Sequence, residues 1–237
     1  MPSVQKKANL KPIVAHCDKT LRLDAIGDYD GAHNGLQVEN NGHITRIAAA
    51  VDASLATVQM AAEAKADLLL VHHGLFWSPQ LPWTGPKRAL IGELVKNNLA
   101  VYSAHLPLDA HPRLGNNAGL CKALKFTKPK PFFEEYGSPI GLRVSTRLCR
   151  DILSDRLKTI LGAAPTLLRG GPSICKKIGI VTGGAGGIEN LRHLRLFAHI
   201  IGQRHRPGAQ CLGRDPHIPR QIVQILRQRQ FGVGRAG

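Results

Sequence analysis

Apolar runs alternate with helical patterns along the chain from residue 44 onward, a pattern typical of a mostly parallel α/β sheet. Ser54 is a good N-cap for the first of the helices, and Pro86 suits the first turn of the second. The expected strands cover residues 44–51, 68–71 and 99–104, and the expected helices cover residues 54–64, 86–96 and 115–123.

A stretch rich in Lys and Pro at residues 125–131 resembles a linker and separates this region from a second set of elements. That set contains strands at 140–144, 166–168 and 178–181 and a helix at 151–161. We therefore predict a two-lobed α/β fold, with a mostly parallel sheet that carries helices on both faces. The expected domains are a first α/β lobe at 1–124, a smaller inserted α/β lobe at 125–175, a return strand and glycine-rich turn to the first lobe at 176–190, and a basic tail at 191–237.

The tail at residues 191–237 differs in kind from the rest of the chain. It holds nine of the 32 basic residues, all of them Arg, and one of the 16 acidic residues, so it carries half of the net charge of +16. Uncompensated Arg is rarely buried, and the tail shows few sustained apolar runs. We expect it to be irregular and to pack poorly, with at most a short basic amphipathic helix at residues 221–230.

Composition excludes several classes of protein. The chain has 237 residues, of which 43% are hydrophobic, which excludes wholesale disorder. No apolar run approaches the roughly 18 residues of a membrane helix, and no secretory signal is visible. The cysteines are scattered without any CxxC pair, so we expect reduced thiols and a cytoplasmic protein that does not bind membranes. The five are Cys17, Cys121, Cys149, Cys175 and Cys211.

Three successive expected strands finish at polar side chains that bind metals in other proteins. Asp52 follows the first, the pair His72 and His73 follows the second, and His105 follows the third, with Asp109 four residues later. The carboxyl ends of parallel strands lie at one edge of a sheet, where α/β proteins place their sites. Imidazole and carboxylate together suit Zn, Mn, Fe or Ni, which this pattern does not distinguish.

A simpler interpretation stands beside the metal site. Adjacent histidines on a regular strand point to opposite faces, and His72 and His73 can converge only if the strand breaks, as Gly74 permits. An ordinary strand-end pair explains the same residues, with Asp109 capping a loop and His105 bonded to backbone. For Asp52 a capping role before the helix is the favoured interpretation. Spacing alone leaves both possibilities open.

Other polar features of the chain are less specific. The glycine-rich run at 183–187 follows a strand and fits a phosphate-binding turn, but it matches neither GxxxxGK[ST] nor GxGxxG. A plain strand–helix turn is the favoured interpretation. The remaining histidines before the tail lack a supporting partner in sequence, and we interpret them as surface or loop residues; they are His16, His33, His43 and His111.

Five sequence blocks point to a family. Residues 30–38 (DGAHNGLQV) resemble the D-x-x-x-NGLQV signature of the NIF-three-like dinuclear metal-centre proteins, which are also called GTP cyclohydrolase type-two homologues. Similar to the family's next blocks, in the right order, are residues 51–54 (VDAS), 71–77 (VHHGLFW), 103–110 (SAHLPLDA) and 181–186 (VTGGAG).

The resemblance implies a fold, an assembly and site residues. It implies a two-lobed α/β fold, a homohexameric ring and two divalent metal ions in each subunit. His72, His73 and Asp109 match three metal ligands of the family. His105 matches a histidine beside the metals that acts in proton transfer, so it is the catalytic residue that the resemblance implies.

The remaining two ligands of the family are not found in this chain. The family supplies them from a C-terminal GHxxTE block, whereas here His217 is followed four residues later by Gln221. Divergence explains the loss, and so does a change of reading frame near residue 188, because misread GC-rich codons give an excess of Arg, Gln, His, Pro and Gly. We favour the frame change, and we expect metal binding weaker than in a complete family member.

Three functions therefore compete. The first is a metal-dependent hydrolase of C–N or phosphoester bonds, similar to a GTP cyclohydrolase, which acts on a small molecule such as a nucleotide and is impaired by the missing ligands. The second is a non-enzymatic metal-binding or scaffold protein whose working form is the ring. The third is nucleic-acid binding through the Arg-rich tail, which we disfavour because a frame change removes most of its basis.

Overall fold

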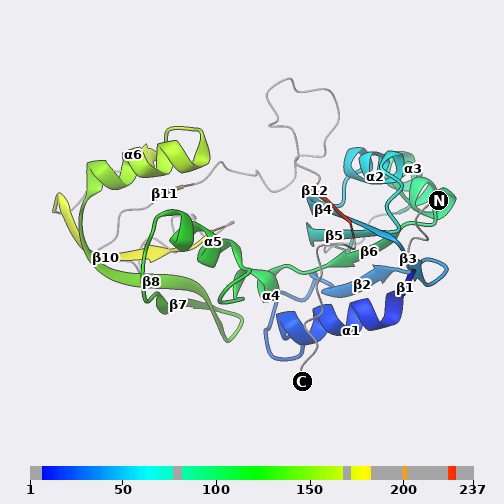
Figure 1. Cartoon of the computed structure of the whole chain (residues 1–237), viewed down its shortest axis with the longest axis horizontal. Coiled ribbons are helices and arrows are strands. Elements are labelled where there is room, and N and C mark those ends of the chain that lie inside the picture. Colours follow the sequence, from blue (N-terminus) through cyan, green and yellow to red (C-terminus); the bar gives the residue numbers. More distant parts are fainter. Residues whose placement is uncertain (1–6, 77–81, 168–171, 183–199, 202–223, 228–237) are drawn as a thin grey trace, which may run out of the picture. The chain divides into compact units, whose positions relative to one another are not determined.

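The computed structural model describes residues 7–76, 82–167, 172–182, 200–201 and 224–227 of the chain (Figure 1). The chain divides into two compact units. The first contains residues 1–107 and 215–237, and the second contains residues 108–214. Among the described residues, no helix combines the length and the apolar character that crossing a bilayer requires.

A five-stranded mixed sheet organises the first unit. Its three central strands are parallel, and each edge strand runs antiparallel to its neighbour. In order across the sheet the strands are β12 (Gln224–Arg227), β4 (Arg46–Asp52), β5 (Leu68–His73), β6 (Ala100–Ser103) and β2 (Gly35–Val38). A short antiparallel pair lies outside it, formed by β1 (Ala8–Asn9) and β3 (His43–Ile44).

Helices cover both faces of this sheet, as the sequence predicts (Figure 1). On one face lie α2 (Leu55–Glu63) and α3 (Gly85–Lys96), and on the other lies α1 (Leu10–Leu21), which is tied to β6 where the Tyr102 hydroxyl donates to Asp18 at 2.9 Å. Ser54 caps α2, and the Thr57 side chain completes a capping box. The core beneath α2 and α3 is formed by Ala48, Val58, Ala61, Ala66, Leu69, Val71, Leu94, Leu99 and Val101.

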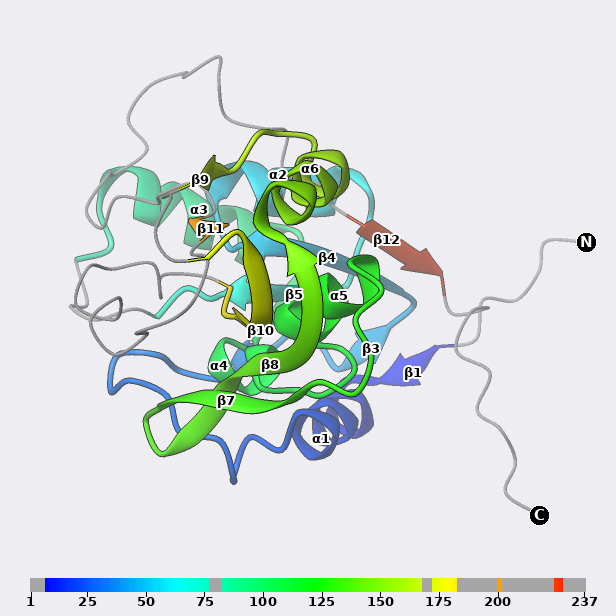
Figure 2. The same ribbon diagram turned by 90° about the vertical axis from the view of Figure 1, so that its left-hand side faces the viewer.

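The second unit is built on an antiparallel sheet in the order β10-β8-β7. Tyr136 and Gly137 form the two-residue turn between β7 and β8, with φ of 47° and 74°, as a tight hairpin of this kind requires. Figure 2, in which this unit faces the viewer, shows β10 running alongside the long β8. The strands are β7 (Lys130–Glu135), β8 (Ser138–Cys149) and β10 (Ile174–Ile180), and β9 (Thr166–Leu167) pairs separately with β11 (Ile200–Ile201).

Two longer helices complete the second unit. They are α5 (Asn116–Ala123) and α6 (Arg150–Leu161), and the helical turn α4 (Leu106–Asp109) runs across the division between the units. Apolar side chains of α5 and α6 share one core with β8 and β10. Its buried members are Cys121, Leu124, Val144, Leu148, Leu153, Leu157, Ile178 and Ile180.

The observed division differs from the expected one in two places. The division falls after residue 107 rather than 124, because α5 contributes Cys121 to the core of the second unit. The strand expected at 178–181 is the end of β10, which pairs with β8 in the second unit and does not return to the first sheet. Part of the expected linker at 125–131 also belongs to a strand, since β7 begins at Lys130.

One prediction about the tail is wrong. Where a helix is expected at residues 221–230, the structure has the strand β12, which adds to the edge of β4. Backbone hydrogen bonds to β4 stabilise a strand at this position, and the apolar pairs in QIVQIL fit either a helix or a strand. Apart from β11, the rest of the tail lies outside the described residues, as do the glycine-rich run at 183–187 and Cys211.

Candidate metal centre

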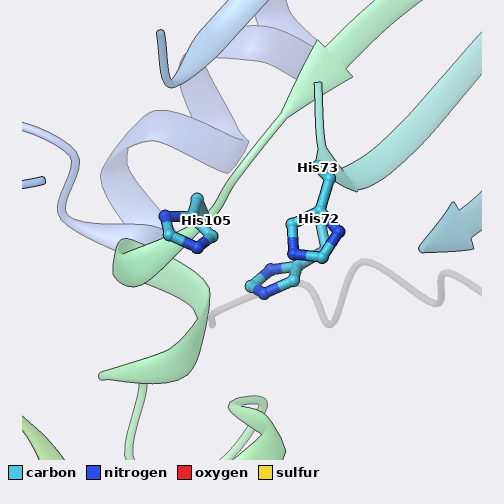
Figure 3. A group of neighbouring side chains, drawn as sticks. All are labelled: His72, His73 and His105. Carbon is cyan, nitrogen blue, oxygen red and sulfur yellow. The ribbon is translucent and has the colours of Figure 1, made fainter. Parts of the chain in front are cut away.

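Three imidazoles gather at the carboxyl ends of β5 and β6 (Figure 3). His72 and His73 end β5, and His105 follows β6 by two residues. One ring nitrogen from each lies within 4.8 Å of those of the other two. The ring centroids of His72 and His73 are only 4.6 Å apart, so the two side chains do not point to opposite faces at the end of the strand. The structure thus brings together three of the predicted site residues.

An oxygen atom lies within hydrogen-bonding distance of Nδ1 in each of these rings. A carbonyl or carboxylate oxygen accepts, so Nδ1 carries the proton and Nε2 carries the lone pair of the neutral ring. Metal-binding histidines are held in this way by oxygens behind the ring. The Nδ1 contacts are His72 to the backbone oxygen of Ala104 at 3.0 Å, His73 to Oδ1 of Asp52 at 2.6 Å, and His105 to Oδ1 of Asp28 at 2.9 Å.

The carboxylate of Asp28 is more enclosed than that of Asp52, since their side chains are 5% and 28% exposed. Burial by itself raises the pKa of this group. Hydrogen bonds from His105, Asn34 and the backbone of Leu106, with the positive charge of His105 when protonated, outweigh burial and hold the pKa of Asp28 below its usual value. Asp28 is therefore an ionised acceptor behind His105.

Asp52 has a different role from the helix cap that the sequence favours. Ser54 is the N-cap of α2 and accepts from the backbone of Thr57 at 3.2 Å. The Asp52 carboxylate is directed instead to His73, its register partner on the neighbouring parallel strand. The prediction that Asp52 caps the helix is wrong because Ser54 occupies the N-cap position.

The segment after the paired histidines is fixed by Gln37 from the NGLQV block. Its Oε1 accepts from the backbone of Leu75 at 2.6 Å, and its Nε2 donates to the backbone oxygen of His33 at 2.6 Å. A Cβ at Gly74 would overlap the Gln37 amide. Gly74 is thus needed for this close approach, in addition to ending the strand.

Asp109, the third predicted ligand, belongs to the second unit. It is 5% exposed, and its Oδ1 accepts from Nδ2 of Asn116 at 2.8 Å. Its role as a ligand remains a prediction. Among the other predicted loop histidines, His111 accepts from the backbone of Leu114 at 2.9 Å, and the described residues contain no second histidine cluster.

The donor set of the cluster fits a transition metal better than Mg²⁺ or Ca²⁺. Neutral imidazole nitrogens suit Zn, Fe and Ni, and three protein ligands are typical of catalytic zinc sites that keep a position open. The sequence identifies these histidines but not Asp28 or Asn34, which lie more than 70 residues before His105. The signature aspartate expected at Asp30 is exposed, and it is Asp28 that bonds Asn34.

Comparisons with known proteins show a family and several relatives to which the chain is similar. The family model described as Duf34/NIF3 (NGG1p interacting factor 3) matches residues 8–194. A GTP cyclohydrolase 1 type 2 homolog of Deinococcus radiodurans is 41% identical over 184 residues, which cover 75% of this chain and 69% of that protein. The homolog of the same name from Neisseria meningitidis serogroup B is 39% identical over 172 residues, 72% of this chain and 68% of its own length.

Solved structures show the same fold. A crystal structure of a Thermus thermophilus protein is similar with a TM-score of 0.71 and 30% identity, covering 80% of this chain and 76% of that one. A structural-genomics protein described as of unknown function has a TM-score of 0.70 and 31% identity, covering 80% and 77%. The fold is therefore that of solved relatives as well as of the matching family.

Proposed function

Because the chain belongs to the Duf34/NIF3 family, we propose that it binds divalent metal ions at His72 and His73, beside His105, and acts as a metal-dependent hydrolase. The observation that carries the proposal is the shared orientation of the three rings. Each has an oxygen at Nδ1, which leaves Nε2 as the nitrogen for a ligand or a proton. A structural histidine cluster does not need all three rings arranged in this way.

We assign separate roles to the residues. His72 and His73 are ligands, with Asp109 as the oxygen ligand of a two-ion centre. A divalent ion held there would supply Lewis acidity for a substrate carbonyl or phosphoryl oxygen. His105, backed by the buried Asp28 carboxylate, takes up a proton from the attacking water at Nε2 and returns it to the leaving group, which is a general acid–base role.

The substrate class follows from the relatives. Relatives about 40% identical in sequence are named as homologs of a GTP cyclohydrolase, so we propose a small molecule with a hydrolysable C–N or phosphoester bond, with a purine nucleotide as the first candidate. We also propose a cytoplasmic homohexamer. Activity is expected to be weak because the C-terminal His and Glu ligands of the family have no counterpart among the residues of this sequence.

A direct experiment separates the hydrolase from a metal-binding scaffold. The full chain is stripped with a chelator, reloaded in turn with Zn²⁺, Mn²⁺, Fe²⁺ and Ni²⁺, analysed for bound metal, and incubated with GTP and with phosphoester substrates. Metal-dependent turnover that His105→Ala abolishes supports the hydrolase. Bound metal without turnover favours the non-enzymatic ring, and no bound metal rejects both.

The exposed His43 provides a matched control for these assays. It lies on β3 and is not among the clustered histidines of the described residues. His43→Ala removes one imidazole without touching the centre, so we expect unchanged metal content and unchanged turnover. Loss of both in this variant would mean that metal is held nonspecifically by surface histidines.

A further inference from the structure

A closed ring of hydrogen bonds joins three residues behind the histidine cluster. The backbone N–H of His105 donates to Oδ1 of Asn34 at 2.7 Å, and Nδ2 of Asn34 donates to Oδ2 of Asp28 at 2.9 Å. Nδ1 of the His105 ring lies 2.9 Å and 3.0 Å from the two oxygens of Asp28. The ring therefore begins at the backbone of His105 and ends at its own imidazole.

The direction of each bond in this ring follows from the backbone. A backbone N–H is only a donor, so the Asn34 atom that faces His105 must be the amide oxygen. The orientation of the Asn34 amide is thereby fixed, and its NH₂ group must face Asp28. Such an assignment is ordinarily ambiguous for an asparagine, but the backbone donor removes the ambiguity here.

Hydrogen-bond donors also surround the Asp28 carboxylate. The backbone N–H of Tyr29 donates to Oδ1 at 2.9 Å, and that of Leu106 donates to Oδ2 at 3.1 Å. With the Asn34 amide, three donors that cannot act as acceptors already face this group. Three such donors stabilise the ionised carboxylate over the protonated carboxyl, in line with the lowered pKa of Asp28.

It follows that Nδ1 of His105 must carry a proton, since it faces an acceptor. The edge of the Tyr29 ring meets the imidazole at 87° with centroids 5.9 Å apart, which further limits ring rotation. The geometry points to Asp28 and Asn34 as positioning residues that hold His105 in the Nδ1–H tautomer, with Nε2 as the atom presented to a proton or a metal ion.

The purpose that we give to this tautomer rests on the proposed function, whereas the measurement of the tautomer does not depend on it. A histidine that transfers a proton at Nε2 needs that nitrogen unprotonated, and the wrong tautomer disables the transfer even when the ring is in place. It also gives the NGLQV block a specific task. Asn34 fixes His105, while Gln37 of the same block fixes the segment after His73.

The tautomer is measurable in the metal-free full chain. Long-range ¹⁵N–¹H correlation spectra of ¹⁵N-histidine protein are recorded at a series of rising pH values until the His105 signals stop shifting, so that the neutral ring is observed. Wild-type protein is expected to show the His105 signal in the Nδ1–H pattern, assigned by its loss in His105→Ala. An Nε2–H pattern in the wild type would overturn the inference without any further variant.

Two variants then identify what fixes the tautomer. In Asp28→Asn the new amide places donors against the backbone N–H groups, and in Asn34→Ala the link to Asp28 is lost, so we expect loss of the pure Nδ1–H pattern in both. Asp28→Glu keeps a carboxylate and should restore part of it. The exposed Asp30→Asn, two residues away, is the matched control and should leave the His105 pattern unchanged.

Unchanged His105 signals in folded Asp28→Asn and Asn34→Ala would reject the positioning role. Folding is checked from the remaining histidine signals in the same spectra, and if neither variant folds the wild-type pattern alone decides. Titrating the wild type with Zn²⁺ completes the experiment. No shift of any cluster histidine would reject metal binding, the proposed function, while leaving the tautomer result intact.

Discussion

Oδ1 of Asp52 lies 2.6 Å from Nδ1 of His73, and the two residues are register partners at the ends of the parallel strands β4 and β5. The pairing of β4 with β5 thus places the Asp52 carboxylate beside Nδ1 of the His73 ring. The same edge carries His72, whose Nδ1 is held by a backbone oxygen of the next strand's end. Sheet register is therefore what organises this side of the centre.

Removing the Asp52 carboxylate should weaken metal binding without disturbing the fold. We expect Asp52→Ala to lower Zn²⁺ affinity about 10- to 100-fold, the usual effect of losing a carboxylate behind a ligand histidine. Asp52→Asn keeps an acceptor for Nδ1 and should lose less. Isothermal titration of the chelator-stripped protein measures both, with the exposed Asp24→Ala as control. Equal affinities in all four proteins would show that His73 is not a ligand.

The approach of Gln37 to Gly74 gives a second prediction. Gly74→Ala displaces the Gln37 amide and costs its two hydrogen bonds, which we expect to lower the free energy of unfolding by about 1–3 kcal/mol. Gly92→Ala in α3 meets nothing within 4 Å and should stabilise by about 1 kcal/mol because Ala is the better helix former. Urea unfolding measures both.

A double mutant tests the mechanism of that loss. In a Gln37→Ala background the added methyl at position 74 no longer displaces a bonded amide, so Gly74→Ala should cost much less. Additive losses would place the strain in the backbone at Gly74 and not in its contact with Gln37.

The buried thiol of Cys121 makes stability fall in alkaline solution. Burial raises its pKa above the ordinary 9.0, so above that pH the unfolded chain loses a proton that the folded chain retains. The stabilising contribution of the protonated Cys121 thiol is complete below the pKa of this thiol in the unfolded chain. It is lost as the pH rises from there through the higher pKa in the folded chain. The free energy of unfolding should decline more steeply between about pH 9 and pH 10 in the wild type than in Cys121→Ala. Parallel declines would contradict this assignment.

The missing C-terminal ligands lead to a prediction about the gene. If the reading frame changes near residue 188, one of the other two frames of the encoding DNA beyond that codon should read a GHxxTE block. Sequencing the locus tests this directly. Absence of the block from all frames would favour divergence, and the ligand deficit would then be a property of the protein itself.

Local patterns predicted most of the first unit. The cap at Ser54 with its apolar helix face, and the apolar runs that became β4, β5 and β6, depend on neighbours in sequence, and the structure confirms them. The helix α1 was not predicted, although half of its 12 residues are apolar. The segment of β12 fits two periods equally well, and pairing with a strand about 175 residues away decides it.

The residues of the site also divide into those that local sequence patterns predict and those that they do not. Histidines at strand ends are visible in sequence, and the common edge of a parallel sheet predicts that they meet. Asp28 and Asn34 were not predicted because their roles consist of hydrogen bonds that span 71 to 77 residues of chain, for which no local pattern exists. Asp52 was assigned to the wrong partner since a strand-end aspartate before Ser54 also fits a cap.

The proposed function requires that His72 and His73 bind a divalent metal ion beside His105. Its most direct test is titration of the chelator-stripped chain with Co²⁺, followed by visible absorption, in the wild type, His73→Ala and His43→Ala. We expect a saturable band of a nitrogen-bound ion in the wild type and in His43→Ala, displaced by Zn²⁺ and lost in His73→Ala. The same band in His73→Ala, or no saturable band in the wild type, would contradict it.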